Sequence, residues 1–192
     1  MKKKEVIITI DENFTPYKFY NNLKFYKFFN RSKIYKIRYD TELNEEVKEE
    51  LEECIIILNI KNKNKKIGAI FDFACRRLDK SYISKNHCEF ENSKCFIQNE
   101  TKKTNGCCGR CRYLVDGHCT QDSITCKLFF CNEIRKNKYC PKINDIKVLK
   151  YFLNSKEKLI FTMSFYKNKE EIIKDTKKNI LFYLFTPTKS NK

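Results

Sequence analysis

The chain has 192 residues, and its 41% hydrophobic content is sufficient for a folded core, which excludes wholesale disorder. Its formal net charge of +16 admits an acidic partner such as nucleic acid, although only seven of its forty basic residues are arginine, the side chain best suited to base and phosphate recognition. No segment approaches the ~20 consecutive apolar residues of a membrane-spanning helix, so no membrane span is expected.

The first forty or so residues predict a strand, a helix and a second strand. Residues 5–10 are mostly β-branched, and residues 33–39 mix isoleucine and tyrosine with basic side chains. Between them, Thr15 and Pro16 predict a helix start, since a hydroxyl caps the first turn and proline fits the first helical position. The predicted helix runs to about residue 30, and five side chains at spacings of three and four form its core-facing side: Phe19, Tyr20, Leu23, Tyr26 and Phe29.

A short acidic helix is predicted for residues 42–53, followed by a β-hairpin. The hairpin consists of a buried strand, a polar turn and a returning strand at residues 54–60, 61–66 and 67–73. Cys54 and Cys75 belong to this predicted sheet region, and we interpret both as packing residues rather than as metal ligands.

The pattern after residue 141 is helical. Asn144 is predicted to cap one helix and Ser155 a second, the latter without a capping box because Lys158 stands where an acidic residue would be needed. Residues 170–178 form an amphipathic, lysine-rich segment, and residues 180–185 predict a final strand.

Nine of the eleven cysteines lie in the segment between residues 88 and 140. The apolar run near the N-terminus is shorter than a secretory signal requires, so we expect a cytoplasmic protein, in which disulfides do not persist. An odd number of cysteines would also leave one thiol unpaired. We therefore predict that the cluster binds metal, with these candidate ligands: Cys88, Cys95, Cys107, Cys108, Cys111, Cys119, Cys126, Cys131 and Cys140.

Thiolates suit both tetrahedral zinc and iron–sulfur clusters, and the cysteine spacing leaves both open. A zinc ribbon would show two Cys-x2-Cys knuckles, and only Cys108 and Cys111 have that spacing. A bacterial ferredoxin would show three cysteines at such intervals before a Cys-Pro pair, and only the pair, Cys140 and Pro141, is present. The minimal predicted site is Cys107, Cys108, Cys111 and either Cys119 or Cys126.

The surroundings of the cysteines support this interpretation. Gly106 and Gly109 flank the adjacent pair of thiols and permit a tight turn. Residues 98–112 contain almost nothing to bury, so we expect a metal to order them. His87 and His118, the only histidines, are either additional ligands or residues with a surface or hydrogen-bonding role.

Three short pieces of this segment carry a family resemblance. Cys-Arg-Tyr-Leu at 111–114, Asp-Gly-His-Cys at 116–119 and Cys-Lys-Leu-Phe at 126–129 resemble the core of the zinc- or iron-chelating cysteine-cluster family, which includes flagellin lysine methylase-like proteins. The resemblance implies metal chelation through Cys111, Cys119 and Cys126. The family usually carries Arg-Pro shortly before the later cysteine, whereas Ser-Ile-Thr stands at 123–125 before Cys126 here.

Together these patterns predict an α+β fold with a small sheet, helices and a central, irregular, metal-stapled cysteine-rich module. The expected divisions are an α/β part at 1–86, the module at 87–141 and a mostly helical part at 142–192 that packs on the first. We expect a cysteine-rich metal-binding protein with a structural zinc or iron–sulfur centre, acting through a protein partner. Common catalytic motifs are absent from the sequence, so enzymatic activity is left open and no catalytic residue is assigned.

Two other functions remain as alternatives. One is an iron–sulfur redox or methyltransferase-type enzyme or its accessory. The other is a zinc-dependent nucleic-acid-binding protein, for which Arg76, Arg77, Arg110 and Arg112 would be the contacts. A structural role is the other interpretation of these arginines. Arg76 and Arg77 would then pair with the acidic residues 45–53, and Arg110 would offset the thiolate charge beside the metal.

Overall fold

Two parallel strands joined by a helix form the N-terminal end of the molecule. In the computed structural model, β1 (Lys4–Ile10) pairs with β2 (Lys33–Tyr39) along their full lengths, and α1 (Pro16–Phe29) makes the crossover between them. The predicted strand, helix and strand are therefore confirmed. The structure describes residues 4–29, 32–91, 94–101, 111–115, 118–137 and 139–178.

The sheet turns one face toward the core. Val6 and Ile8 pack against the main core on this face, while Glu5 and Lys36 form an ion pair at 2.8 Å on the other. Tyr35 is buried in the middle of β2, and the side chain of Asn59 exchanges two hydrogen bonds with its backbone, at 2.9 and 2.8 Å. This amide satisfies backbone groups of β2 in place of a third strand.

The predicted hairpin is wrong, because helices occupy its place. The acidic segment begins α2 (Glu45–Asn59), which continues through the apolar run, and α3 (Lys63–Lys85) follows after a short connection. Asn62 caps α3 by accepting a hydrogen bond from the Lys65 backbone at 3.0 Å. A helix that is buried on most sides is apolar all round, so periodicity alone does not distinguish its end from a buried strand.

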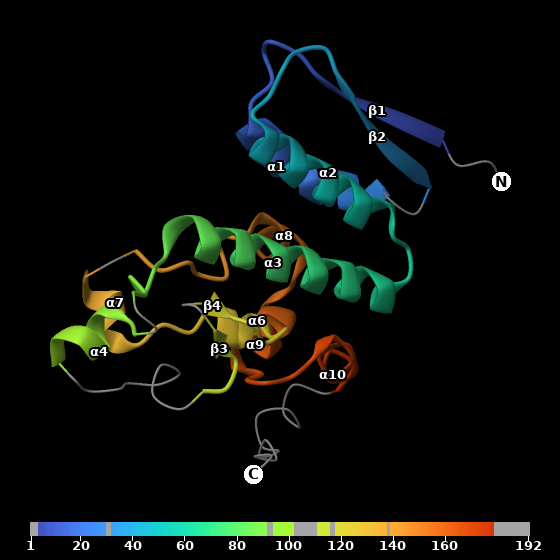
Figure 1. Cartoon of the computed structure of the whole chain (residues 1–192). Helices are drawn as coiled ribbons and strands as arrows, with labels where there is room; N and C mark the ends of the chain where they lie inside the picture. The colour runs from blue at the N-terminus through green and yellow to red at the C-terminus, as the bar shows by residue number, and fades with distance from the viewer. Residues whose placement is uncertain are drawn as a thin grey trace.

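Three short helices follow the cysteine-rich segment and pack on this framework. They are α8 (Lys147–Phe152), α9 (Ser155–Met163) and α10 (Lys169–Asp175). Of these, α8 contacts both α2 and α3, and α10 contacts α3. Figure 1 shows α3 running between the N-terminal elements and the group of short helices and strands on its other side.

Two predicted caps in this region are wrong. The N-cap of α8 is Ile146, without a side-chain hydrogen bond, so Asn144 does not cap it. The N-cap of α9 is Asn154 rather than Ser155, and it forms a capping box with Glu157, the acidic partner that a cap at Ser155 would have lacked. The strand predicted at residues 180–185 lies outside the described residues.

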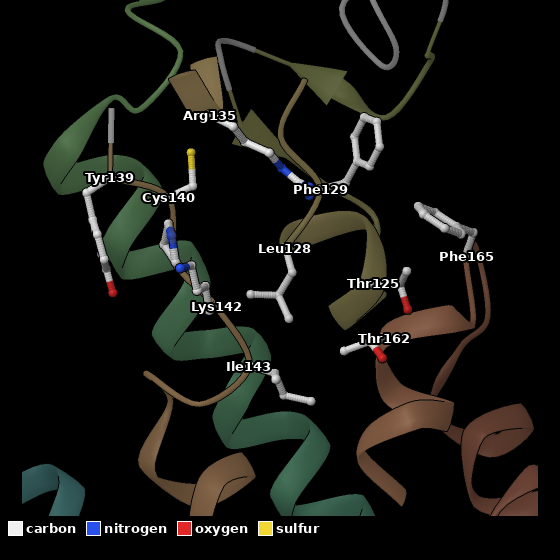
Figure 2. A pocket seen from close by; sticks show the side chains of 11 residues that line it. Thr125, Leu128, Phe129, Arg135, Tyr139, Cys140, Lys142, Ile143, Thr162 and Phe165 are labelled. Atoms are coloured by element: carbon white, nitrogen blue, oxygen red, sulfur yellow. The ribbon is translucent and has the colours of Figure 1, made fainter. Parts of the chain in front are cut away.

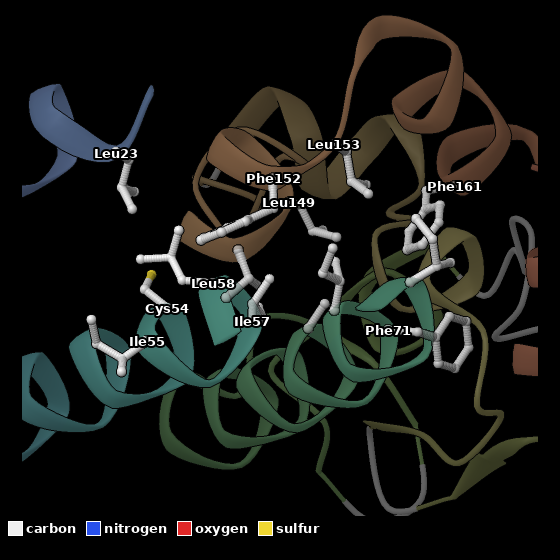
Figure 3. Packing of buried hydrophobic residues seen from close by; sticks show 14 of the residues in the cluster. Leu23, Cys54, Ile55, Ile57, Leu58, Phe71, Leu149, Phe152, Leu153 and Phe161 are labelled. Carbon is white, nitrogen blue, oxygen red and sulfur yellow. The ribbon is translucent and has the colours of Figure 1, made fainter. Parts of the chain in front are cut away.

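The main core lies where these helices meet. Figure 3 shows Leu23 of α1, Leu58 of α2 and Phe71 of α3 contributing to one cluster, together with Leu149, Phe152, Leu153 and Phe161 of the C-terminal part. None of the helices in the described part of the chain combines the length and the apolar character needed to cross a membrane.

Cys54 and Cys75 are buried in this core, as expected of packing residues, but they lie on α2 and α3 and not in a sheet. Burial raises the pKa of Cys54, and it raises the pKa of Cys75 to about 12. Both side chains therefore remain neutral thiols at pH 7. Their burial and neutrality fit the interpretation of Cys54 and Cys75 as packing residues.

A buried carboxylate at the end of α10 gives a testable pH dependence. Asp175 is 4% exposed at its side chain and pairs with Lys167 and Lys178, each at 2.6 Å. Burial alone would raise the pKa of Asp175, but the hydrogen bonds from the two lysines lower it overall. A lowered carboxyl pKa adds stability above the unfolded pKa, and this stability is lost as pH falls through the folded pKa.

We expect Asp175→Asn to lower the free energy of unfolding by about 2 kcal/mol at pH 7, because it leaves two ammonium groups without their carboxylate. Urea denaturation at several pH values should show the difference from wild type shrinking as pH falls below about 4. Asp72→Asn, which removes an exposed ion pair with Lys169 at 3.1 Å, should cost under about 1 kcal/mol. A difference for Asp175→Asn that is the same at every pH would contradict this assignment.

Candidate metal centre

Four of the nine candidate cysteines line one cavity of about 380 Å³, which we call the thiol pocket. Tyrosine, phenylalanine, leucine and glutamine residues complete the walls. The four cysteines are Cys88, Cys111, Cys119 and Cys126. The structure thus brings together three thiols of the segment between residues 111 and 129 and one from the end of α3.

Local structure explains how Cys88 reaches the pocket. Helix α3 ends at Lys85, and Asn86 closes it in the left-handed conformation with φ 37°. Asparagine tolerates this conformation better than most residues. The Asn86 side chain accepts a hydrogen bond from the Phe90 backbone at 2.8 Å, so the chain turns back just where Cys88 lies.

A small hairpin and a helical turn place the other three thiols. Strand β3 (Leu114–Val115) pairs antiparallel with β4 (His118–Cys119), so that Leu114 lies opposite Cys119. Cys111 accepts a backbone hydrogen bond from Leu114 at 3.2 Å at the start of this hairpin. Cys126 lies in α6 (Ile124–Lys127), which is capped by the side chain of Ser123.

Neighbouring thiols of the pocket influence the pKa of Cys119. Burial raises the pKa of Cys119, the neighbouring Cys126 and Cys111 raise it further, and a backbone N–H of Gln121 and the charge of Lys127 oppose the rise. The Tyr166 backbone N–H donates a hydrogen bond to the Cys126 sulfur at 3.4 Å. Such donors stabilise sulfur that carries negative charge.

The thiols share a cavity without forming a ligand cage. Across the described ranges, no group of three or more His, Cys, Asp or Glu side chains is arranged so that it could hold a metal ion. Likewise, seven of the cysteines that the structure describes are free thiols: Cys54, Cys75, Cys95, Cys111, Cys119, Cys126 and Cys131. Cys107 and Cys108, half of the minimal predicted site, lie outside the described residues.

The three other candidate cysteines that the structure describes belong to a small second core. Cys95 and Cys140 are buried in it with Tyr82 and Phe130, and Cys131 packs against it. Burial raises the pKa of Cys140, the charge of Arg135 opposes this rise and Cys131 adds to it. The short helices α4 (Phe96–Thr101) and α7 (Asn132–Asn137) lie beside these cysteines in the chain. We call this group the satellite core.

His87 also belongs to this region and has a hydrogen-bonding environment. It is 5% exposed, its Nε2 lies 3.0 Å from the Ser81 hydroxyl, and its ring meets those of Tyr82 and Phe130 edge-on. Of the two roles left open by the sequence, the hydrogen-bonding one fits these contacts. The side chain of His118 lies outside the described residues.

A buried lysine beside the thiol pocket was not predicted from the sequence. Lys127 is 2% exposed, forms an ion pair with Asp79 of α3 and donates to the Cys119 carbonyl at 3.1 Å. The Lys127 carbonyl in turn accepts a hydrogen bond from Tyr82 at 2.6 Å. The sequence signal was a lysine placed between Cys126 and the apolar run Leu128 to Phe130.

No family model matches this chain, and neither a curated protein nor a solved structure is significantly similar to it. The resemblance to the cysteine-cluster family therefore rests on residues 111–129 alone.

Proposed function

We propose that this chain is a cysteine-rich metal-binding protein whose thiol pocket holds zinc or an iron–sulfur cluster as a structural centre. The observation that carries the proposal is that four thiols, one from the turn after α3 and three from between residues 111 and 126, line one cavity. The proposed ligands are Cys88, Cys111, Cys119 and Cys126. Thiolates are the ligands that both kinds of centre prefer.

The composition of the pocket fits such a centre. Several thiolates around one metal carry net negative charge, and the buried Lys127 ammonium lies close enough to lower the pKa of Cys119. The Tyr166 N–H supplies a hydrogen bond to one of the sulfurs. Metal binding would draw the thiols together, so that its free energy also stabilises the fold of this segment.

The centre would act as a cross-link. The hairpin of β3 and β4 has two residues in each strand, too few to be stable alone. A metal held by Cys88 as well as by the hairpin and α6 would fasten them to the end of α3. The proposal includes a reducing compartment, which keeps the thiols available, and an acidic protein partner, which the net charge of +16 favours.

Two of the four arginines proposed as nucleic-acid contacts form ion pairs with acidic residues of α2. Arg77 pairs with Glu53 at 3.2 Å and with Glu49 at 3.4 Å, and Arg76 lies 3.6 Å from Glu53. These ion pairs join α3 to α2, as expected if Arg76 and Arg77 pair with the acidic residues 45–53. Nothing in the described residues favours the redox or methyltransferase alternative over a structural centre.

Metal analysis of anaerobically purified protein tests the proposal. We expect at least one equivalent of zinc or iron per chain. Colourless protein containing zinc would identify the structural zinc form, and brown protein absorbing near ~400 nm would identify an iron–sulfur cluster and revive the redox alternative. The absence of both metals, with disulfides mapped among the nine clustered cysteines, would overturn the proposal.

A further inference from the structure

A second cavity, of about 590 Å³, lies between the end of the cysteine-rich segment and α9, and we call it the aromatic pocket. Cavities of this size bind small organic ligands. Its lining residues are Thr125, Leu128, Phe129, Arg135, Tyr139, Cys140, Pro141, Lys142, Ile143, Thr162 and Phe165. Neither the metal centre nor its ligands in the thiol pocket require this cavity.

The walls of the aromatic pocket are mostly apolar. Figure 2 shows the rings of Phe129 and Phe165 on one side, Tyr139 and Lys142 on the other, and Leu128 between them. The two phenylalanine rings meet edge-on with centroids 5.9 Å apart. Both also line the thiol pocket, so this ring pair is a wall shared by the two cavities.

The hydroxyl groups of the pocket are already engaged by the protein. Thr125 donates to the Phe161 carbonyl at 2.8 Å, and Thr162 donates to the Lys158 carbonyl at 3.0 Å. Tyr139 donates to the carboxylate of Asp145. Polar recognition of a ligand would therefore fall to the two cationic side chains of the lining, Arg135 and Lys142.

These two cations are available for a ligand. Arg135 and Lys142 are both exposed, and among the described residues no carboxylate forms an ion pair with either side chain. Asp145 is the acidic group beside Lys142, from whose backbone N–H it accepts a hydrogen bond at 2.7 Å. Figure 2 shows the Arg135 side chain extending across the pocket toward Phe129.

We propose that the aromatic pocket binds a small organic anion with an apolar body, such as an aromatic or branched-chain carboxylate. Arg135 and Lys142 would hold the anionic group, because an ammonium and a guanidinium give charge-assisted hydrogen bonds to it. Phe129, Phe165 and Leu128 would cover the apolar body. The ligand would lie against the wall shared with the thiol pocket.

Two fluorescent dyes test this in the full-length, metal-loaded chain. Anilinonaphthalene sulfonate has an apolar body and a negative charge, and N-phenylnaphthylamine has a similar body without the charge. We expect Arg135→Gln/Lys142→Gln to weaken binding of the anionic dye about tenfold and to leave the neutral dye within about twofold. Phe165→Ala should weaken both dyes.

Matched controls separate the pocket from the general surface charge. Lys24→Gln/Lys150→Gln removes the same net charge from exposed lysines on α1 and α8 and should leave both dyes unchanged. Metal content should be unchanged in Arg135→Gln/Lys142→Gln, so failure of this proposal is distinguishable from failure of the metal centre. Absence of dye binding to the wild type would overturn the proposal, as would equal weakening by the control pair.

Discussion

Cys111→Ser and Cys126→Ser are each expected to release the metal from the protein and to unfold the segment that carries the thiol pocket. The physical reason is that the hairpin of β3 and β4 has only two residues in each strand and depends on the cross-link, whereas Ile124 anchors α6 in the main core. In such a segment the free energy of metal binding is folding free energy, which reaches about 10–16 kcal/mol for structural zinc in small domains. Losing one of four ligands should remove most of it.

The measurement is metal stoichiometry on anaerobically purified variants, followed by limited proteolysis of the same samples. We expect the metal content to fall from at least one equivalent to a small fraction, and cleavage to begin within residues 111–129. Proteolysis reports local unfolding because a protease cuts the opened chain.

Three matched cysteine variants define the boundary of the site. Cys54→Ala and Cys75→Ala remove thiols buried in the main core and should leave the metal content unchanged, whatever they cost in stability. Cys131→Ser alters the satellite core and should also keep the metal of the thiol pocket. Equal metal loss in Cys54→Ala would show that the site extends beyond the clustered cysteines, and equal loss in Cys131→Ser would show that the satellite core contributes a ligand.

Lys127→Met is expected to lower the free energy of unfolding by about 2–3 kcal/mol. The Lys127 side chain is 2% exposed, and its ammonium group joins Asp79 of α3 to the carbonyl of Cys119 in β4. Its removal leaves the carbonyl without this donor and Asp79 without its cation. Because the Asp79 side chain is 37% exposed and regains water, the expected cost lies below the ~3–5 kcal/mol of a fully buried pair.

Urea denaturation of wild type and variant, both loaded with metal, measures this difference. Lys24→Met replaces an exposed lysine of α1 in the same way and should change the stability by less than about 0.5 kcal/mol. Asp79→Asn provides a second view of the same contact and should cost at least as much as Lys127→Met, since it leaves the buried Lys127 ammonium without its carboxylate. If Lys127→Met had the same free energy of unfolding as the wild type, the ion pair of Lys127 and Asp79 would not stabilise the packing of the cysteine-rich segment on α3.

Local patterns in the sequence were sufficient for the N-terminal strand, helix and strand, because alternation, a hydroxyl cap and spacings of three and four are properties of neighbouring residues. They were also sufficient to separate Cys54 and Cys75 from the clustered cysteines. They failed between residues 54 and 73, where the helices α2 and α3 replace a predicted hairpin. There a continuous apolar run suits a helix buried on most sides as well as it suits a buried strand.

Tertiary packing alone decided which cysteines meet. Spacing grouped Cys107, Cys108 and Cys111 and gave no reason to add Cys88, yet Cys88, which lies 23 residues before Cys111 in the chain, lines the thiol pocket beside it. That meeting depends on how α6 and the small hairpin lie against α3, a contact secured by Lys127 and Asp79. Pairing across such distances along the chain leaves no period in the sequence, since it depends on which surfaces bury each other once the helices have formed.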